Sequence, residues 1–176
     1  MVSIISETIL SKEMSLNESA ASTWTYEAVE IPTAIQEGIA VIILGVEFLS
    51  NHAKDVPPAG VNPEVIKNMI LEEKYTSEPQ PTDPNVIAQQ RLAYWGDATD
   101  ITLILEQCFG LAIKSPSDIV NPAQGYMTGR EKVYIATVST NAGTANQIRA
   151  RMYYITVKLT TKEIAMIGLR EAFEGD

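Results

Sequence analysis

Few residues of this chain have the types and spacing that enzyme chemistry requires. His52 is the only histidine and Cys108 the only cysteine of the sequence. A Ser-His-Asp arrangement or a zinc site needs further partners, and one cysteine cannot close an internal disulfide. Asp97 and Asp100 could offer oxygen ligands to calcium, but their segment lacks the glycine and the final glutamate of a twelve-residue calcium loop. We therefore predict no catalytic, metal or cofactor site.

Two further segments carry residue types found in functional sites, but their spacing does not match a known type of site. The segment Gly125-Tyr-Met-Thr-Gly129 lacks the Gly-Lys-Ser/Thr of a phosphate-binding loop. Glu47 and Glu106 leave one enzyme class open, a hydrolase built on paired carboxylates, because the sequence does not say whether the two acids face each other. Unpaired acids at strand ends are commoner than such pairs. We expect that the protein is not an enzyme.

Cationic side chains recur at a spacing of two in the C-terminal half. Arg149 and Arg151 share one strand face, and Arg130 and Lys132 have the same spacing in a neighbouring segment. Together they could contact the acidic surface of another copy or a phosphate group, whereas the alternative is a solvated strand face. We predict Arg149 and Arg151 as residues of a subunit interface.

The charge of the chain is unevenly distributed. The net charge is −9, and residues 1–88 carry 4 basic and 13 acidic side chains, whereas residues 89–176 carry 9 of each. Phosphate backbones attract Lys and Arg, so this balance argues against direct nucleic-acid binding by the protein as a whole.

The length of 176 residues is typical of a single domain. No basic residue precedes Lys12, so we expect no secretory signal. The longest apolar run, residues 39–49, is interrupted by Glu47 and is shorter than the roughly 20 residues that span a bilayer, so we expect no transmembrane segment. Residues 1–22 are expected to form an N-terminal arm or an edge strand, and residues 23–176 a single domain.

Alternating and β-branched segments predict a mainly β protein. We expect strands at 23–31, 38–49 and 100–109, and a hairpin of strands 132–139 and 146–160. Residues 83–90 could form a short helix, although 86–95 could equally be a strand. The strand at 38–49 is apolar on both faces, so the second face needs cover from a helix, a loop or another protein molecule.

Helices are predicted at two places. Asn62-Pro63-Glu64 has the residue types of a helix start, which predicts a helix over 63–75. Thr160 and Glu163 fit a capping box at the start of a C-terminal helix over 161–174. Ile164 and Ile167 lie off the main apolar face of that helix, and we predict that they contact a second subunit.

The order of an arm, seven or eight strands, long loops with proline and glycine, and a short final helix resembles the small single-jelly-roll coat (capsid) proteins of icosahedral viruses. The resemblance is one of layout and is clearest over residues 147–160 and the helix that follows. It implies an all-β, jelly-roll-like antiparallel β-sandwich that has no active site or cofactor. It further implies that copies of the chain, with or without other capsid subunits, assemble into the shell of a virion. The chain lacks the basic arm that many RNA-packaging coat proteins carry.

A second function stays open at this point. The protein could be a ligand- or carbohydrate-binding β-sandwich module of an appendage, with Trp24, Trp95 or the tyrosines as a stacking platform. Outside a virion, the expected location is the cytoplasm.

Overall fold

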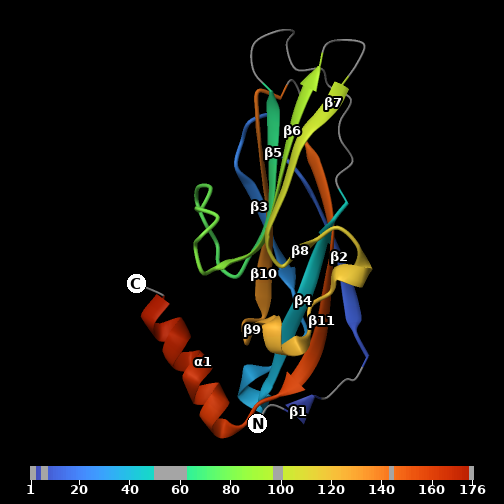
Figure 1. Cartoon of the computed structure of the whole chain (residues 1–176). Coiled ribbons are helices and arrows are strands. Elements are labelled where there is room, and N and C mark those ends of the chain that lie inside the picture. Colours follow the sequence, from blue (N-terminus) through green and yellow to red (C-terminus); the bar gives the residue numbers. More distant parts are fainter. Residues whose placement is uncertain (1–2, 5–7, 50–62, 97–100, 143–144, 175–176) are drawn as a thin grey trace.

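The computed structural model describes residues 3–4, 8–49, 63–96, 101–142 and 145–174 (Figure 1). The described residues form strands, three short 3₁₀ turns and one α-helix. The strands are β1 (Ser3–Ile4), β2 (Leu10–Asn17), β3 (Thr25–Glu30), β4 (Ile39–Phe48), β5 (Glu64–Leu71), β6 (Val86–Gly96), β7 (Ile101–Gly110), β8 (Ala112–Ile113), β9 (Tyr126–Thr128), β10 (Lys132–Thr140) and β11 (Gln147–Lys158). The helix is α1 (Thr161–Glu174), and the 3₁₀ turns are η1 (Ile35–Glu37), η2 (Pro116–Asp118) and η3 (Pro122–Gln124).

The strands form two sheets that pack as a sandwich. In the six-stranded sheet β11 lies between β4 and the strands β1 and β2, and β4 also pairs with β8 and β9. The five-stranded sheet has the order β3-β10-β5-β6-β7. The chain passes from β2 to β3 to β4 to β5 by alternating between the sheets, and it alternates again from β9 to β10 to β11, as jelly rolls do. Among the described strands every pair is antiparallel except the two-residue pairing of β4 with β8, so the predicted all-β, jelly-roll-like antiparallel sandwich is confirmed.

The predicted hairpin of the last two long strands is wrong. Strand β10 pairs with β3 and β5, whereas β11 pairs with β2 and β4 in the other sheet. Each of the two strands already has a neighbour on both sides, so neither has a free edge for the other. The connection between Thr140 and Gln147 therefore crosses from one sheet to the other.

The predicted helix at 63–75 is also wrong, because residues 64–71 form the central strand β5. Ile66 and Ile70 are buried on one face of the strand, and Met69 and Leu71 are buried on the opposite face. Neighbours β6 and β10 hydrogen-bond the strand along both edges, and this pairing outweighs the local helix-start signal. The undecided segment 86–95 is a strand as well.

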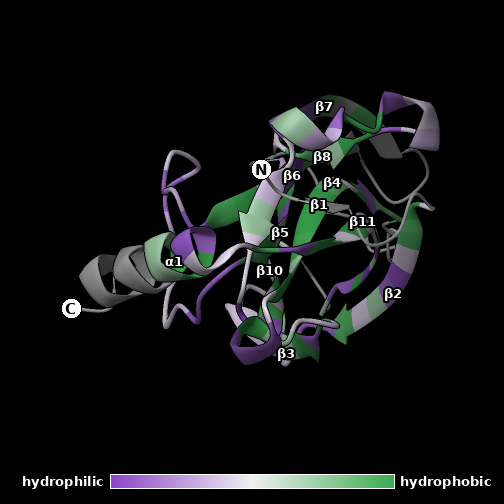
Figure 2. Ribbon diagram, turned by 90° about the horizontal axis from the view of Figure 1, so that it is seen from below, coloured by the Kyte–Doolittle hydropathy of each residue, from purple (hydrophilic) through white to green (hydrophobic). Residues whose placement is uncertain are grey.

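Strand β4 is apolar on both faces, as its sequence indicates, and Figure 2 shows hydrophobic residues along it. A register shift opposite Tyr153 and Tyr154 makes Leu44 an extra residue in the strand. Before the bulge Val41 and Ile43 face the sandwich interior, and after it Val46 and Phe48 take that place. The other face of β4 packs against α1 and loops of the same chain, so no second molecule is needed to cover it.

The N-terminal segment contributes an edge strand. Within the predicted arm, β1 and β2 both pair with β11, and β2 does so over its whole length. Met14 and Leu16 of β2 are buried in the sandwich core.

The described helix is not long and apolar enough to cross a membrane.

Candidate functional surfaces

Arg149 and Arg151 line an open hollow of about 380 Å³ on the outside of β11, together with Glu13 and Leu49. The Nε of Arg151 donates to Oε1 of Glu13 at 3.2 Å across the β2–β11 pair. This hydrogen bond raises the pKa of Arg151 above its usual range. Arg149 is exposed and makes no ion pair within the described part of the chain. One of the two predicted interface arginines is thus engaged by its own sheet, and the other is free to contact another molecule.

Arg130 and Lys132 lie elsewhere. Both belong to the five-stranded side of the sandwich, where they line a hollow of about 530 Å³. Arg130 forms an ion pair with Glu73. The lining mixes acidic and basic side chains with one tyrosine: Glu72, Glu73, Lys74, Arg130, Glu131, Lys132 and Tyr134. The four cations therefore do not form the single strip that the predicted hairpin required, and this mixed lining is not a phosphate site.

Two buried glutamates in this fold were not identified from the sequence. The carboxylate of Glu72, fully buried, accepts a 2.6 Å hydrogen bond from the hydroxyl of Tyr126. Glu18 is 3% exposed and accepts hydrogen bonds from backbone N–H groups of three separate segments. Apart from Thr23, which follows Glu18 by five residues, the hydrogen-bond partners lie more than 50 residues away in the sequence, so no spacing could have indicated them.

Glu47 and Glu106 each have a partner of their own. The carboxylate of Glu47, on β4, accepts a hydrogen bond from the hydroxyl of Tyr153 at 3.0 Å. Glu106, on β7, accepts from Gln90 at 3.2 Å and from Lys114 at 2.9 Å. The bond to Glu106 raises the pKa of Lys114. The two acids lie in different sheets and are held separately, which gives no support to a carboxylate pair.

The remaining residues with possible chemistry offer no reactive arrangement. Burial, more than the nearby Glu106, raises the pKa of the Cys108 thiol, which disfavours the nucleophilic thiolate. Gly125 lies so close to β4 that a Cβ would approach Ile42 to 2.5 Å, so its glycine serves packing. The described residues hold no cluster of three or more potential metal ligands. His52, Asp97 and Asp100 lie outside the described residues.

Ile164 and Ile167 pack against the protein's own sheet. Ile167 is 8% exposed, and both side chains pack with Ala40 and Leu44 on the outer face of β4. The reason for placing them at a subunit interface is therefore removed, because their own sheet supplies the second partner. Met166, also on α1, is 61% exposed.

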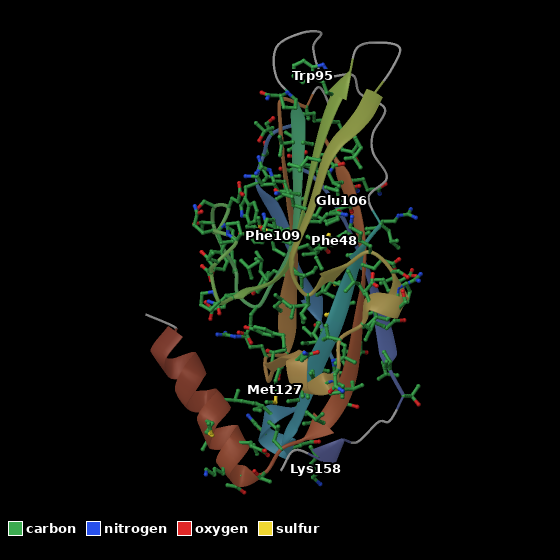
Figure 3. The ribbon with its side chains drawn as sticks, in the orientation of Figure 1. Phe48, Trp95, Glu106, Phe109, Met127 and Lys158 are labelled. Carbon is green, nitrogen blue, oxygen red and sulfur yellow. The ribbon has the colours of Figure 1, made fainter. Side chains whose placement is uncertain are left out.

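Exposed apolar side chains gather instead on the β6–β7 hairpin. The described residues include eight large hydrophobic side chains that are exposed, and four of them belong to this hairpin: Trp95 (47%), Leu103 (45%), Leu105 (37%) and Phe109 (38%). We call these four residues the apolar edge, and Figure 3 labels Trp95 near its tip and Phe109 near its base. The sequence predicts β7 as a strand but does not say that it ends a sheet, so it gives no sign of this surface.

The tryptophans of the carbohydrate-binding alternative have different environments. The indole N–H of Trp24 donates to the carbonyl of Tyr75 at 3.0 Å, and its ring packs with Met69 and Leu71. Burial of the Tyr75 hydroxyl raises its pKa to about 12. Trp24 is therefore part of a small packed cluster, whereas Trp95 keeps an exposed ring.

Comparison with known proteins does not assign the chain to a family. No protein-family model and no curated protein matches it. One solved structure, described by the words "Bacillus endospore appendages form a novel family of disulfide-linked pili", matches over 87% of this chain and 90% of its own, with 14% sequence identity and a TM-score of 0.23. A TM-score this low carries no argument about the fold or the function of this chain.

Proposed function

We propose that this chain is a structural protein, a viral capsid subunit that assembles with copies of itself or with sibling subunits into the shell of a virion. The apolar edge is the observation that carries the proposal. Four of the eight exposed large hydrophobic side chains of the described residues lie on this one hairpin, and a concentration of exposed apolar side chains often marks a binding surface. The jelly-roll order of the strands is compatible with this role, since viral coat proteins are one of several classes that use it.

The solution mass of the purified protein and electron microscopy of the same sample test this proposal. We expect species much heavier than the 19.3 kDa chain, and closed particles at high protein concentration. Phe109→Lys places a charge in the apolar edge and should abolish the particles, because burying an unpaired ammonium group is costly. Met166→Lys changes an even more exposed apolar residue on α1 and is the matched control, which should still assemble. A monomer at every concentration would contradict the proposal, whereas particles of Phe109→Lys indistinguishable from wild type would show that the apolar edge does not form the contacts of the shell.

The exposed ring of Trp95 favours a second candidate, a carbohydrate-binding module of an appendage, because aromatic faces stack on sugar rings. This candidate predicts binding on a glycan array that Trp95→Ala abolishes and that Trp24→Phe, at the half-buried tryptophan, retains. If no glycan is bound by the wild-type protein, the second candidate is rejected.

A further inference from the structure

Strand β7 is the longest edge strand in the part of the chain that the structure describes. It ends the five-stranded sheet, has ten residues, and within the described part of the chain pairs along one side alone, with β6 (Figure 1). An edge strand presents unpaired N–H and C=O groups, and proteins usually protect such edges with charges, proline or short length. Glu106 is the one charged residue of β7, and Lys114 neutralises it at 2.9 Å.

The other sheet edges carry that protection. Strand β3, at the far end of the same sheet, is six residues long and exposes Glu27 and Glu30. Strand β2 exposes Lys12 and Glu13, and β8 and β9 have two and three residues. Charge and length thus separate β7 from every other described edge.

The two faces of β7 differ in character. Residues that lie directly opposite one another in a sheet point to the same face. A register shift opposite Ala93 and Tyr94 makes Ile104 an extra residue in β7. From Leu105 to Gly110 the strand is regular, so Leu105, Gln107 and Phe109 share the outer face of the sheet. Figure 3 shows Phe109 and Glu106 on opposite sides of the strand, in agreement with this alternation.

We propose that two copies of this chain join through β7, edge to edge and antiparallel about a two-fold axis, so that their two five-stranded sheets become one continuous sheet. This contact deepens the proposed function, because it would be one of the contacts between subunits that a shell needs. Its role in a shell rests on that proposed function. An isologous contact uses the same patch on both copies, which suits an edge that is nearly neutral and apolar.

A second β7 fits this edge better than β3 of another copy. Pairing β7 with β3 would bring Glu106 to an edge that exposes Glu27 and Glu30, and it would leave the exposed apolar side chains of β7 beside carboxylates. Like charges across a strand pair are destabilising. The self-pairing of β7 brings apolar residues together instead.

The position of the bulge selects the register. With Gln107 on the axis, Leu105 of one copy lies opposite Phe109 of the other, on the same outer face, and Glu106 lies opposite Cys108. Centring the pair on Glu106 would place two carboxylates face to face. Centring it on Leu105 would extend the pairing through the bulge and oppose inward Leu103 to outward Gln107. Of these three registers, the one with Gln107 on the axis pairs Leu105 with Phe109 without opposing like charges or crossing the bulge.

A cysteine at the axis tests the proposal. In antiparallel pairs the opposed Cα atoms are about 4.5–5.5 Å apart, within the range of roughly 4.4–6.8 Å that a disulfide spans. Gln107→Cys in a Cys108→Ser background should therefore give a covalent dimer under mild oxidation. Ala28→Cys in the same background places an exposed cysteine on the guarded edge β3 and is the matched control, which should stay monomeric.

Leu105→Lys, at an exposed side chain, provides a second measurement that needs no new cysteine. It should raise the dissociation constant of the dimer by about tenfold or more in sedimentation equilibrium, with an unchanged circular dichroism spectrum. Cross-linking of Gln107→Cys at no higher yield than Ala28→Cys, or an unchanged dissociation constant, would overturn the proposal. Particles that persist in Leu105→Lys would reject this contact and leave the capsid function standing, whereas a cross-linked dimer that never forms particles would reject the capsid function and leave this contact standing.

Discussion

Glu18 shows how a single buried carboxylate holds one corner of the sandwich. Its Oε1 accepts the N–H of Thr23 at 3.0 Å and that of Ser139 at 2.9 Å, and its Oε2 accepts the N–H of Asn146 at 2.9 Å. The hydroxyl of Ser139 donates as well, at 2.7 Å. These donors come from the β2–β3 connection, the end of β10 and the residue just before β11. A buried charge is tolerated when hydrogen bonds satisfy it in this way.

Glu18→Gln is therefore expected to lower the free energy of unfolding by about 2 kcal/mol, because the amide nitrogen would face backbone donors and leave at least one of them unsatisfied. Urea denaturation followed by circular dichroism measures this loss. Glu13→Gln is the matched control, since Glu13 is 71% exposed and its ion pair with Arg151 should contribute little. Equal midpoints for the two variants would show that Glu18 does not stabilise the corner.

At the scale of elements, local patterns predicted the existence of strands and of the last helix. The capping box at α1 is confirmed: Glu163 accepts the N–H of Thr160 at 2.8 Å, and the Glu163 N–H donates to the Thr160 hydroxyl at 3.4 Å. The hydrogen bonds from Thr160, the backbone one first, lower the pKa of Glu163. Such signals are readable because both partners lie within one turn of the chain.

The errors lie where distant neighbours decide. The helix-start signal at Pro63 is local, but β5 is paired on both sides and takes its conformation from the sheet. Alternation in β10 and β11 indicates which residues face the core, but it does not tell which strand lies alongside. The bulge at Leu44 and the edge position of β7 depend equally on pairing, so the faces of β4 and the apolar edge could not be obtained from the sequence.

At the scale of the whole molecule, charge opposes association between copies. The chain carries a net charge of −9, and several of its cations already pair internally, among them Lys67 with Glu78, Arg130 with Glu73 and Arg151 with Glu13. Each copy therefore presents a like-charged surface to the next. Apolar and backbone contacts such as those of β7 must overcome this repulsion if copies assemble.

The salt dependence of assembly distinguishes the two kinds of contact. Raising the salt from about 0.05 M to about 0.5 M shortens the Debye length from more than 10 Å to a few ångströms and screens the repulsion between copies, so association through the apolar edge should strengthen. Sedimentation velocity at several salt concentrations measures this change. Contacts between Arg149 and an acidic neighbour would behave in the opposite way, because the same ions would screen their attraction. Assembly that weakens as salt rises, and that Arg149→Ala removes at low salt, would place the main contact at β11 instead of β7.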